Sequence, residues 1–240
     1  MSRYEDNAVR EMIAWQKEMQ RKPGSAGSIA KNLQSKMNGI IPEKAHEIIT
    51  EAIKNMVKAV LFGSEYTATA PLMQRDLETR ENLVREKMQL YKKAAAVSGA
   101  GTGAGGILLG LADFPILLSL KMKFLFDTAG LYGFDAKNYK ERLYMLYVFQ
   151  LAFSSQERRN DVFEIVADWN NYSKGLPENQ DYFDWRTFQQ EYRDYIDIAK
   201  MLQLVPGIGA IAGAYANYKL MDKLGDNAVN AYRMRVIKFE

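Results

Sequence analysis

Asp113 is the residue whose position most directly suggests chemistry. It is the only charged residue between positions 94 and 120. A carboxylate in an apolar stretch has to cap a helix, pair with a cation or serve a function. In the first case Asp113 accepts backbone N–H groups of a helix that starts just after it. If Asp113 instead pairs with a cation, the candidate counter-ions are Arg142, Arg158, Arg159, Arg233 and Arg235. If it serves a function, it is an acid of raised pKa or a contact for an ion or a partner.

A glycine-rich run just before Asp113 matches the dinucleotide-binding pattern G-x-G-x-x-G at residues 101–106, and Asp127 follows about 20 residues later. That fingerprint requires a strand immediately before the glycines, inside a βαβ unit. The residues that precede it, 91–96, are helix formers. We therefore expect no nucleotide site here.

Two further short patterns lack the residues that their chemistry needs. His46-Glu47 begins like a zinc-protease signature, but position 50 is Thr50 instead of a second histidine. Ser28 and Lys31 have the Ser-x-x-Lys spacing of acyl-enzyme proteins, without the partner motifs. The sequence thus predicts no catalytic residue, no metal site and no cofactor.

The composition narrows the function classes. The chain has 240 residues with 48% hydrophobic residues, enough for a core, and a net charge of only +3. No run of four or more Lys/Arg residues occurs, so we expect no nucleic-acid partner. There is no cysteine and one histidine, which excludes disulfides and multi-histidine centres and fits a cytoplasmic protein.

The hydrophobic periodicity predicts helices throughout and no strand. The first helix, 4–21, carries apolar residues three or four apart and is amphipathic. Pro71 is expected to start a helix that runs to about 97, and Gly225-Asp226 to separate two helices near the end of the chain. Helix 137–153 lacks a polar face and is therefore expected to be buried. The remaining predicted helices cover 27–38, 42–62, 114–127, 156–171, 184–203, 207–223 and 226–237.

Two Gly/Ala-rich apolar segments, 94–120 and 201–218, dominate the pattern. A spanning helix needs about 20 mostly apolar residues. The large apolar residues of 94–112 contribute roughly −2 to −3 kcal/mol to insertion, and Asp113 about +3 kcal/mol, so we expect no membrane-spanning helix. Glycines four residues apart let two helix backbones approach closely, and we expect the segments to pack on each other. These glycines are Gly99 and Gly103, Gly106 and Gly110, and Gly209 and Gly213.

Lysines flank the first segment on both sides: Lys92 and Lys93 before it, and Lys121 and Lys123 after it. If these cations remain on one side of a membrane, the segment forms a shallow re-entrant hairpin that bends at the glycines and Pro115. The alternative is a helical core in water. The sequence leaves both possibilities open.

Nearly the whole chain resembles the EcsC family. The resemblance rests on residues 41–67, on the glycine run that ends in Asp113-x-Pro115, on the Leu-Tyr-Gly-Phe-Asp stretch at 131–135, and on residues 205–235. It implies an accessory protein encoded beside an ABC transporter, in systems tied to protein secretion and regulated proteolysis. It implies no established catalytic residues.

Together, these observations predict an all-α, compact multi-helix bundle in which the two Gly/Ala-rich segments pack centrally. We expect an N-terminal amphipathic region at 1–38 and an EcsC-like domain at 39–240. The function we expect is that of a non-enzymatic cytoplasmic protein at the inner face of the plasma membrane, with ABC transporter subunits and the membrane surface as partners and the oligomeric state open. The alternative is a helical hydrolase-like enzyme or a lipid-binding module with a pocket near Asp113.

Overall fold

The described part of the chain is built from α-helices and short 3-10 turns, with no strand. The computed structural model describes residues 2–21, 43–62, 69–100, 113–154, 158–182, 184, 186, 188 and 210–237. This confirms the all-α prediction. The helices are α1 (Arg3–Met19), α3 (Glu43–Phe62), α4 (Leu77–Ala100), α6 (Phe114–Leu131), α7 (Tyr139–Phe153), α8 (Arg159–Ala167), α9 (Trp169–Tyr172) and α12 (Ala210–Val236).

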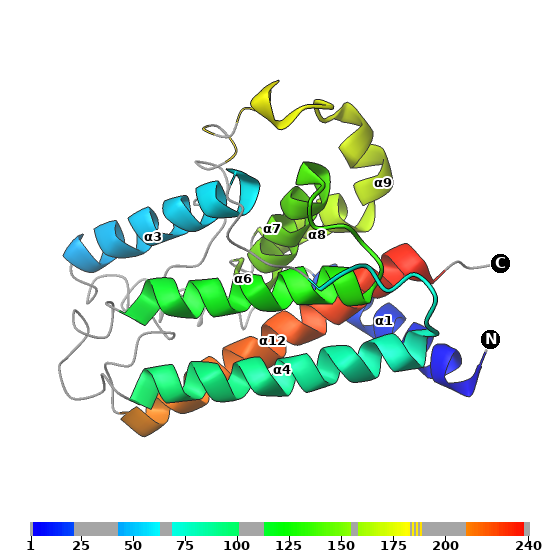
Figure 1. The fold of residues 1–240 in the computed structure, drawn as a ribbon, viewed down its shortest axis with the longest axis horizontal. Helices are drawn as coiled ribbons and strands as arrows, with labels where there is room; N and C mark the ends of the chain where they lie inside the picture. Colours follow the sequence, from blue (N-terminus) through cyan, green and yellow to red (C-terminus); the bar gives the residue numbers. More distant parts are fainter. Residues whose placement is uncertain are drawn as a thin grey trace.

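The last helix, α12, is the centre of the arrangement. It packs along most of α4 and also contacts α1, α6, α7 and α8. Figure 1 shows α4, α6 and α12 lying lengthwise, with α4 antiparallel to both neighbours, while α3 and α7 to α9 lie above them. The N-terminal helix α1 lies at the end of the bundle where both chain termini emerge.

The core is formed mainly by α6 and α7, which are buried on most of their sides. Every residue of α7 from Leu143 to Phe153 is buried, as predicted for a helix without a polar face. In α3, the periodic apolar residues 49, 53, 56, 57, 60 and 61 are buried as well. Within the described residues, none of the helices combines the length and apolar character that a membrane crossing requires.

The predicted amphipathic face of α1 is directed into the protein. Ala8, Met12, Trp15 and Met19 are all buried. The Trp15 indole donates to Asn227 Oδ1 at 3.3 Å and meets the Phe163 ring edge-on at 5.5 Å. This helix therefore packs on α12, α4 and α8. The predicted boundary at 38/39 lies outside the described residues, as does the helix predicted at 27–38.

Two predicted helix boundaries were wrong, each for a physical reason. The helix expected from Pro71 begins at Leu77, because the carboxylate of Asp76 caps it by accepting the Thr79 N–H at 2.8 Å. The break expected at Gly225 does not occur, since α12 continues from 210 to 236. A Cβ at Gly225 would overlap Met88 Sδ, so this glycine lets α4 and α12 approach closely.

Two other predicted helices fit the structure less simply. The helix expected at 156–171 is divided at Asp168 into α8 and α9. The helix expected at 184–203 lies outside the described residues, apart from positions 184, 186 and 188.

The segment before α4 lies directly on α6 at Gly130. The Leu72 N–H donates to the Gly130 carbonyl at 2.9 Å, and a Cβ at Gly130 would overlap the backbone carbonyl of Thr69. The predicted turn at 131–135 follows, with Gly133 at φ +93°, a conformation that favours glycine.

We expect Gly130→Ala to lower the free energy of unfolding by about 1–3 kcal/mol, because the backbone of residue 69 cannot move aside as a side chain can. Urea unfolding measures this. Gly175→Ala is the matched control, since no atom lies within 4 Å of its added methyl group, and it should change stability by less than about 0.5 kcal/mol. Equal effects of the two substitutions would contradict the packing described here.

Candidate functional site

Asp113 occupies the N-cap position of α6, but its side chain makes no capping hydrogen bond. Its backbone is helical, with φ −87° and ψ −7°, whereas a capping side chain reaches the helix from an extended backbone. The predicted position is therefore confirmed and the predicted capping hydrogen bond is not formed. Pro115 lies in the first turn of α6, where its missing N–H costs nothing.

Only some of the predicted glycines lie in the described part of the chain. Gly99 belongs to α4 and Gly213 to α12, two helices that pack along each other. Gly103, Gly106, Gly110 and Gly209 lie outside the described residues. The pairing of glycine faces stays a prediction.

The four lysines predicted to flank a membrane segment differ sharply in their surroundings. Lys92 is buried, forms an ion pair with Asp222, and has its ammonium 4.4 Å from the centre of the Tyr218 ring. Lys121 is also buried, while Lys93 is exposed and Lys123 lies 3.5 Å from Asp127. A flanking role at a membrane surface is thus left to Lys93 and Lys123.

Lys121 is the most unusual charged residue of the described chain. Its side chain is 0% exposed, and its Nζ has no hydrogen-bond partner among the described residues. Burial lowers the pKa of this amine to about 7. An ammonium without water or a counter-ion is strongly disfavoured, so about half of the amine is neutral near pH 7 and most of it is neutral at higher pH.

A second buried polar side chain without a partner in the described part of the chain belongs to α12. Asn217 is 0% exposed, and within the described residues neither atom of its side-chain amide has a hydrogen-bond partner. Tyr91 of α4 contacts Phe124 of α6 at a ring distance of 6.1 Å, and Lys92 contacts α12 at Tyr218. Since α4 runs antiparallel to both helices (Figure 1), this register puts residues 121 and 217 at a similar level along α4.

A small groove lies between α3 and α6, and neither Lys121 nor Asn217 lines it. It has a volume of about 200 Å³ and a mainly apolar lining. Asp113 does not line it, although Pro115 does. The lining residues are Ala52, Asn55, Met56, Ala59, Pro115, Leu118 and Ser119.

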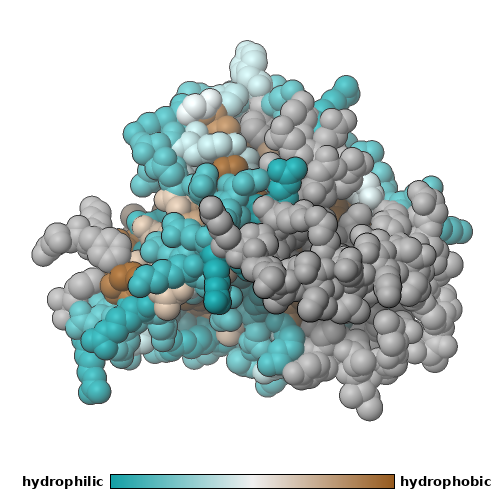
Figure 2. All heavy atoms as spheres, turned by 180° about the vertical axis from the view of Figure 1, so that it is seen from behind, coloured by the Kyte–Doolittle hydropathy of each residue, from teal (hydrophilic) through white to brown (hydrophobic). Residues whose placement is uncertain are grey.

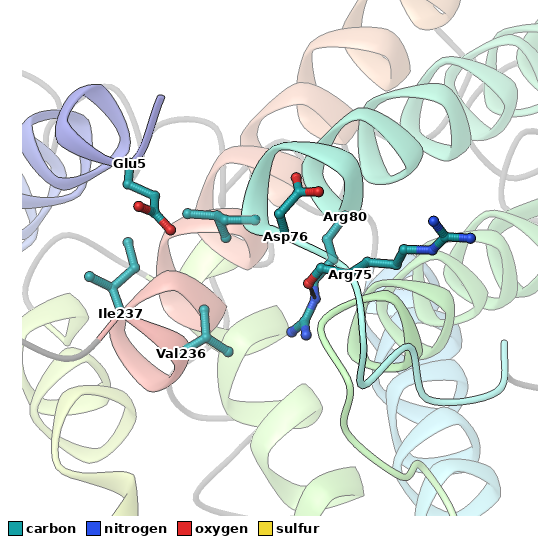
Figure 3. Close-up of a pocket in the computed structure, with 7 residues that line it drawn as sticks. Glu5, Arg75, Asp76, Arg80, Val236 and Ile237 are labelled. Atoms are coloured by element: carbon teal, nitrogen blue, oxygen red, sulfur yellow. Dashed lines mark hydrogen bonds between the residues drawn. The ribbon is translucent and has the colours of Figure 1, made fainter. Parts of the chain in front are cut away.

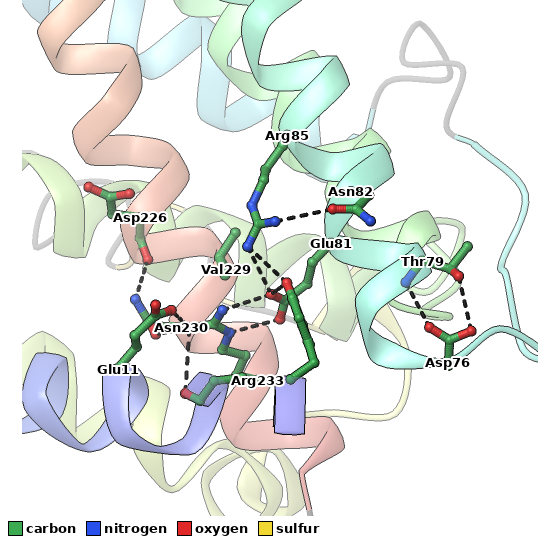
Figure 4. Close-up of polar contacts among 12 residues, drawn as sticks. Glu11, Asp76, Thr79, Glu81, Asn82, Arg85, Asp226, Val229, Asn230 and Arg233 are labelled. Carbon is green, nitrogen blue, oxygen red and sulfur yellow. Dashed lines mark hydrogen bonds and ion pairs between the residues drawn. The ribbon is translucent and has the colours of Figure 1, made fainter. Parts of the chain in front are cut away.

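Near the C-terminal end of α12, Arg233 and Glu81 are both buried and paired with each other. Arg233 makes a two-point contact with Glu81 of α4, through two nitrogen–oxygen distances of 2.7 Å, and a third to Glu11 of α1 at 2.8 Å (Figure 4). The Tyr4 and Tyr132 hydroxyls also donate to Glu81. Burial alone would raise the pKa of Glu81, but the hydrogen bonds and charge of Arg233 outweigh it and lower the pKa.

A second buried pair follows two residues later. Arg235 and the Tyr232 hydroxyl both donate to Glu141 Oε1 of α7 at 2.8 Å. The Arg235 guanidinium also lies 3.7 Å from the centre of the Phe134 ring. Here burial prevails over the Arg235 charge and raises the pKa of Glu141. Two arginines proposed as counter-ions of Asp113 therefore serve other carboxylates.

Asp127, the acid expected in a dinucleotide site, has a structural role instead. It accepts the Tyr91 hydroxyl at 2.8 Å and the Thr69 hydroxyl at 3.0 Å, and Lys87 lies 3.4 Å away. Burial tends to raise its pKa, but these donors and cations lower it overall. Residues 91–96 belong to α4, so no strand precedes the glycine run, as the sequence analysis expected.

A second cavity, of about 320 Å³, lies where α1, α4 and α12 meet (Figure 3). Charged and apolar side chains from these helices line it, including Glu5, Asp76 and Val236. Its Arg80 guanidinium is engaged with the backbone, since it donates to the carbonyls of residues 73, 75 and 132. The Arg80 guanidinium is therefore not available to bind a ligand in this cavity. The Asp76 carboxylate is engaged as well, because it caps α4.

The buried pairs were missed by the sequence analysis, although a signal was present. Glu81 lies in a charged stretch that looks like a solvated helix face. It nevertheless falls on the apolar stripe of α4, between Leu77 and Val84, both of which are buried. A charged residue on an apolar stripe is typical of a buried pair.

Comparison with known proteins supports the resemblance found in the sequence. The family model of the EcsC protein family matches residues 6–237. The chain is 43% identical over 231 residues to Protein EcsC of Bacillus subtilis (strain 168). The aligned residues cover 96% of this chain and 95% of that protein. The chain is 29% identical over 194 residues to the uncharacterized protein YdbA of the same organism. This alignment covers 80% of this chain and 68% of YdbA. No solved structure matches the chain.

We expect Lys121→Met to stabilise the protein by roughly 3–5 kcal/mol at pH 7, because methionine needs no proton release on burial. The unfolded chain keeps the lysine proton up to about pH 10.5 and the folded chain loses it near pH 7. Stability of the parent therefore rises with pH across this range, and the advantage of the variant shrinks. Urea unfolding at pH 7 and at about pH 9.5 measures both effects. Lys93→Met, at an exposed position, should change neither the stability at pH 7 nor its dependence on pH. A gain in stability of Lys121→Met that does not vary with pH would contradict the burial of an unpaired amine.

Removing one partner of the Glu81 pair should have the opposite effect. We expect Arg233→Met to lower the free energy of unfolding by about 3–5 kcal/mol, since it leaves a buried carboxylate without its counter-ion. Arg10→Met, at an exposed position of α1, should change stability by less than about 0.5 kcal/mol. A loss at Arg233 no larger than at Arg10 would contradict the pairing.

Proposed function

The chain belongs to the EcsC family, and on that premise we propose that it is a non-enzymatic accessory protein that binds an ABC transporter at the inner face of the plasma membrane. The proposal starts from the implication of the family resemblance. Two structural features support it further: the exposed apolar residues of α4, and the pairing of the buried carboxylates with arginines.

The observation that carries the proposal is an apolar and basic stripe on the outer face of α4. Leu90 is 59% exposed and Val97 is 74% exposed, and both lie three or four residues from the exposed Lys93. Residues at this spacing lie on one helix face. Large apolar side chains that face water are favourable contacts for another protein, and a lysine among them favours an acidic partner surface.

This stripe is conspicuous because much of the remaining described surface is polar. Figure 2 shows one face of the molecule on which hydrophilic residues predominate and hydrophobic residues appear in small areas. The amphipathic helix α1 does not supply a second apolar surface, because its apolar residues are buried against the bundle. We therefore assign the docking role to α4 and not to α1.

The surroundings of the buried Glu81 and Glu141 favour a structural role for these carboxylates over a catalytic one. Glu81 and Glu141 are each held by an arginine and by tyrosine hydroxyls, and both are buried. These groups fix helices relative to one another, and neither glutamate lines either of the two cavities described above. Asp113, around which the enzyme alternative was built, lines neither of the two cavities described above.

Fractionation of cell lysates tests the proposal. The parent chain should sediment with membranes when the transporter subunits are present and remain in the supernatant when they are deleted. Replacing both Leu90 and Val97 by serine should reduce the membrane-bound fraction several-fold, because the apolar contact is lost. Unchanged distribution after deletion of the transporter would contradict the proposal.

The matched control for this experiment is Met73→Ser. Met73 is 72% exposed, but it lies in the turn before α4 and not on the stripe. It should fractionate like the parent chain. Loss of binding in the control to the same extent would show that the α4 stripe is not the docking surface.

A further inference from the structure

Two lysines from neighbouring helices share one buried carboxylate at the surface between α4 and α6. The ammonium of Lys87 lies 3.4 Å from Asp127 Oδ2, and the ammonium of Lys123 lies 3.5 Å from Asp127 Oδ1. The carboxylate side chain is 3% exposed, whereas the two lysine side chains are 40% and 38% exposed. The two cations therefore reach the surface, while the anion that holds them together does not.

One carboxylate does not balance the charge of two ammonium groups. Asp127 also accepts the hydroxyls of Tyr91 and Thr69, which are neutral donors, so the cluster keeps a net charge of +1. An ammonium has three N–H donors, and its hydrogen bonds to phosphate are strengthened by charge. The lysine pair is thus suited to a second anion, and a phosphate group has enough oxygens to bind both lysines.

The helix face that carries Lys123 continues as an apolar surface. Ile116, Leu120 and Lys123 lie within about 60° of one another around α6, since successive residues of a helix are about 100° apart. Ile116 is 53% exposed and Leu120 is partly buried. Ile116 lies about 10 Å from Lys123 along the helix axis. We refer to Lys87, Ile116, Leu120 and Lys123 as the α4–α6 face.

The acidic residues near the α4–α6 face do little to reduce its positive charge. Asp127 is the only acidic residue of α6 and is buried. Asp113, which precedes α6, is half-buried and lies about 15 Å from Lys123 along the helix axis. The exposed Glu86 adjoins Lys87 in the chain but is turned by about 100° from it around α4. The face thus combines an exposed apolar residue with cations that are only partly neutralised.

We propose that the α4–α6 face contacts anionic phospholipid, with Lys87 and Lys123 binding headgroup phosphate and with Ile116 and Leu120 lying against the adjoining acyl region. Apolar side chains together with lysines are typical of surfaces that lie in the membrane interface. The cytoplasmic leaflet supplies the anionic lipids that complement the two ammonium groups. A free phosphate ion would meet the lysines but would leave Ile116 in water, and for this reason we assign the site to a lipid.

This inference extends the proposed function and rests on it for the location of the chain at the membrane. Because α6 packs along α4, the α4–α6 face adjoins the docking stripe on the outer face of α4. A protein docked on a membrane-embedded transporter meets lipid beside it. Each lysine raises the affinity for an anionic surface by only about fivefold. Lipid contact alone is therefore too weak to keep the chain on membranes that lack the transporter.

Sedimentation of the purified full-length chain with phospholipid vesicles, without any transporter, tests the lipid site. Vesicles of phosphatidylglycerol and phosphatidylcholine in equal parts are compared with vesicles of phosphatidylcholine alone, at low ionic strength and high lipid concentration. We expect the chain to partition about tenfold more strongly into the mixed vesicles, and this preference should be lost at about 1 M salt. Equal partition into both kinds of vesicle at low ionic strength would overturn the proposal.

Two double variants with the same change in net charge separate the α4–α6 face from a general attraction of a basic chain. Lys87→Gln with Lys123→Gln should lower partition into the mixed vesicles about tenfold. Asp127 keeps its two hydroxyl donors in this variant, so the protein should stay folded. Lys17→Gln with Lys137→Gln, at exposed positions of α1 and of the turn before α7, should lower partition less than about twofold. Equal losses in the two double variants would overturn the assignment of the face.

The apolar part of the face has its own test. Ile116→Ser should lower partition into the mixed vesicles severalfold, whereas Ile13→Ser, at a 36% exposed position of α1, should not. Partition of Ile116→Ser equal to that of the parent would overturn the lipid assignment in favour of a free phosphate.

An acidic protein surface is the remaining occupant that the experiments distinguish. If the lysine double variant loses transporter-dependent sedimentation while the parent does not prefer the anionic vesicles, the face contacts the transporter. The lipid proposal is then wrong and the proposed function stands. A preference for anionic vesicles that depends on Lys87, Lys123 and Ile116 supports the lipid site, even if deletion of the transporter leaves the cell fractionation unchanged.

Discussion

The two-point contact between Arg233 and Glu81 is the interaction on which the arrangement of the helices depends. A guanidinium and a carboxylate that are both buried have lost their water, and only a good mutual geometry compensates for that loss. The pair joins α12 to α4. Glu11 of α1 accepts a hydrogen bond from Arg233, and Tyr132 at the end of α6 donates one to Glu81. Arg235 then ties α12 to α7. One helix end therefore fixes the relative positions of four others.

The opposite end of the bundle is organised by a different rule. There the fold buries Lys121 and Asn217 without providing partners in the described part of the chain. At the first end Arg233 and Glu81 satisfy each other, although within the described residues Nε of the half-buried Arg235 has no hydrogen-bond partner either. We interpret the Arg233–Glu81 pair as the structural anchor of the bundle.

Much of the fold could be predicted from the sequence because apolar periodicity reports directly on buried helix faces. The buried faces of α1, α3 and α7 follow from it. The errors came from residues whose role depends on a distant neighbour. Gly225 looks like a break until Met88 is placed against it, and Glu81 looks solvated until Arg233 arrives from 152 positions away. Lys121 looked like a surface cation for the same reason, because only tertiary packing shows that it faces inward.

The most direct test of this account is the pKa of Lys121 in the ligand-free protein. It can be measured by following the lysine ¹³Cε and ¹⁵Nζ signals with pH, using Lys121→Met to assign the resonance. We expect this amine to titrate near pH 7, because burial without a counter-ion disfavours the ammonium. A titration near pH 10.5, like that of an ordinary lysine, would contradict the claim that one end of the bundle holds an unpaired buried amine.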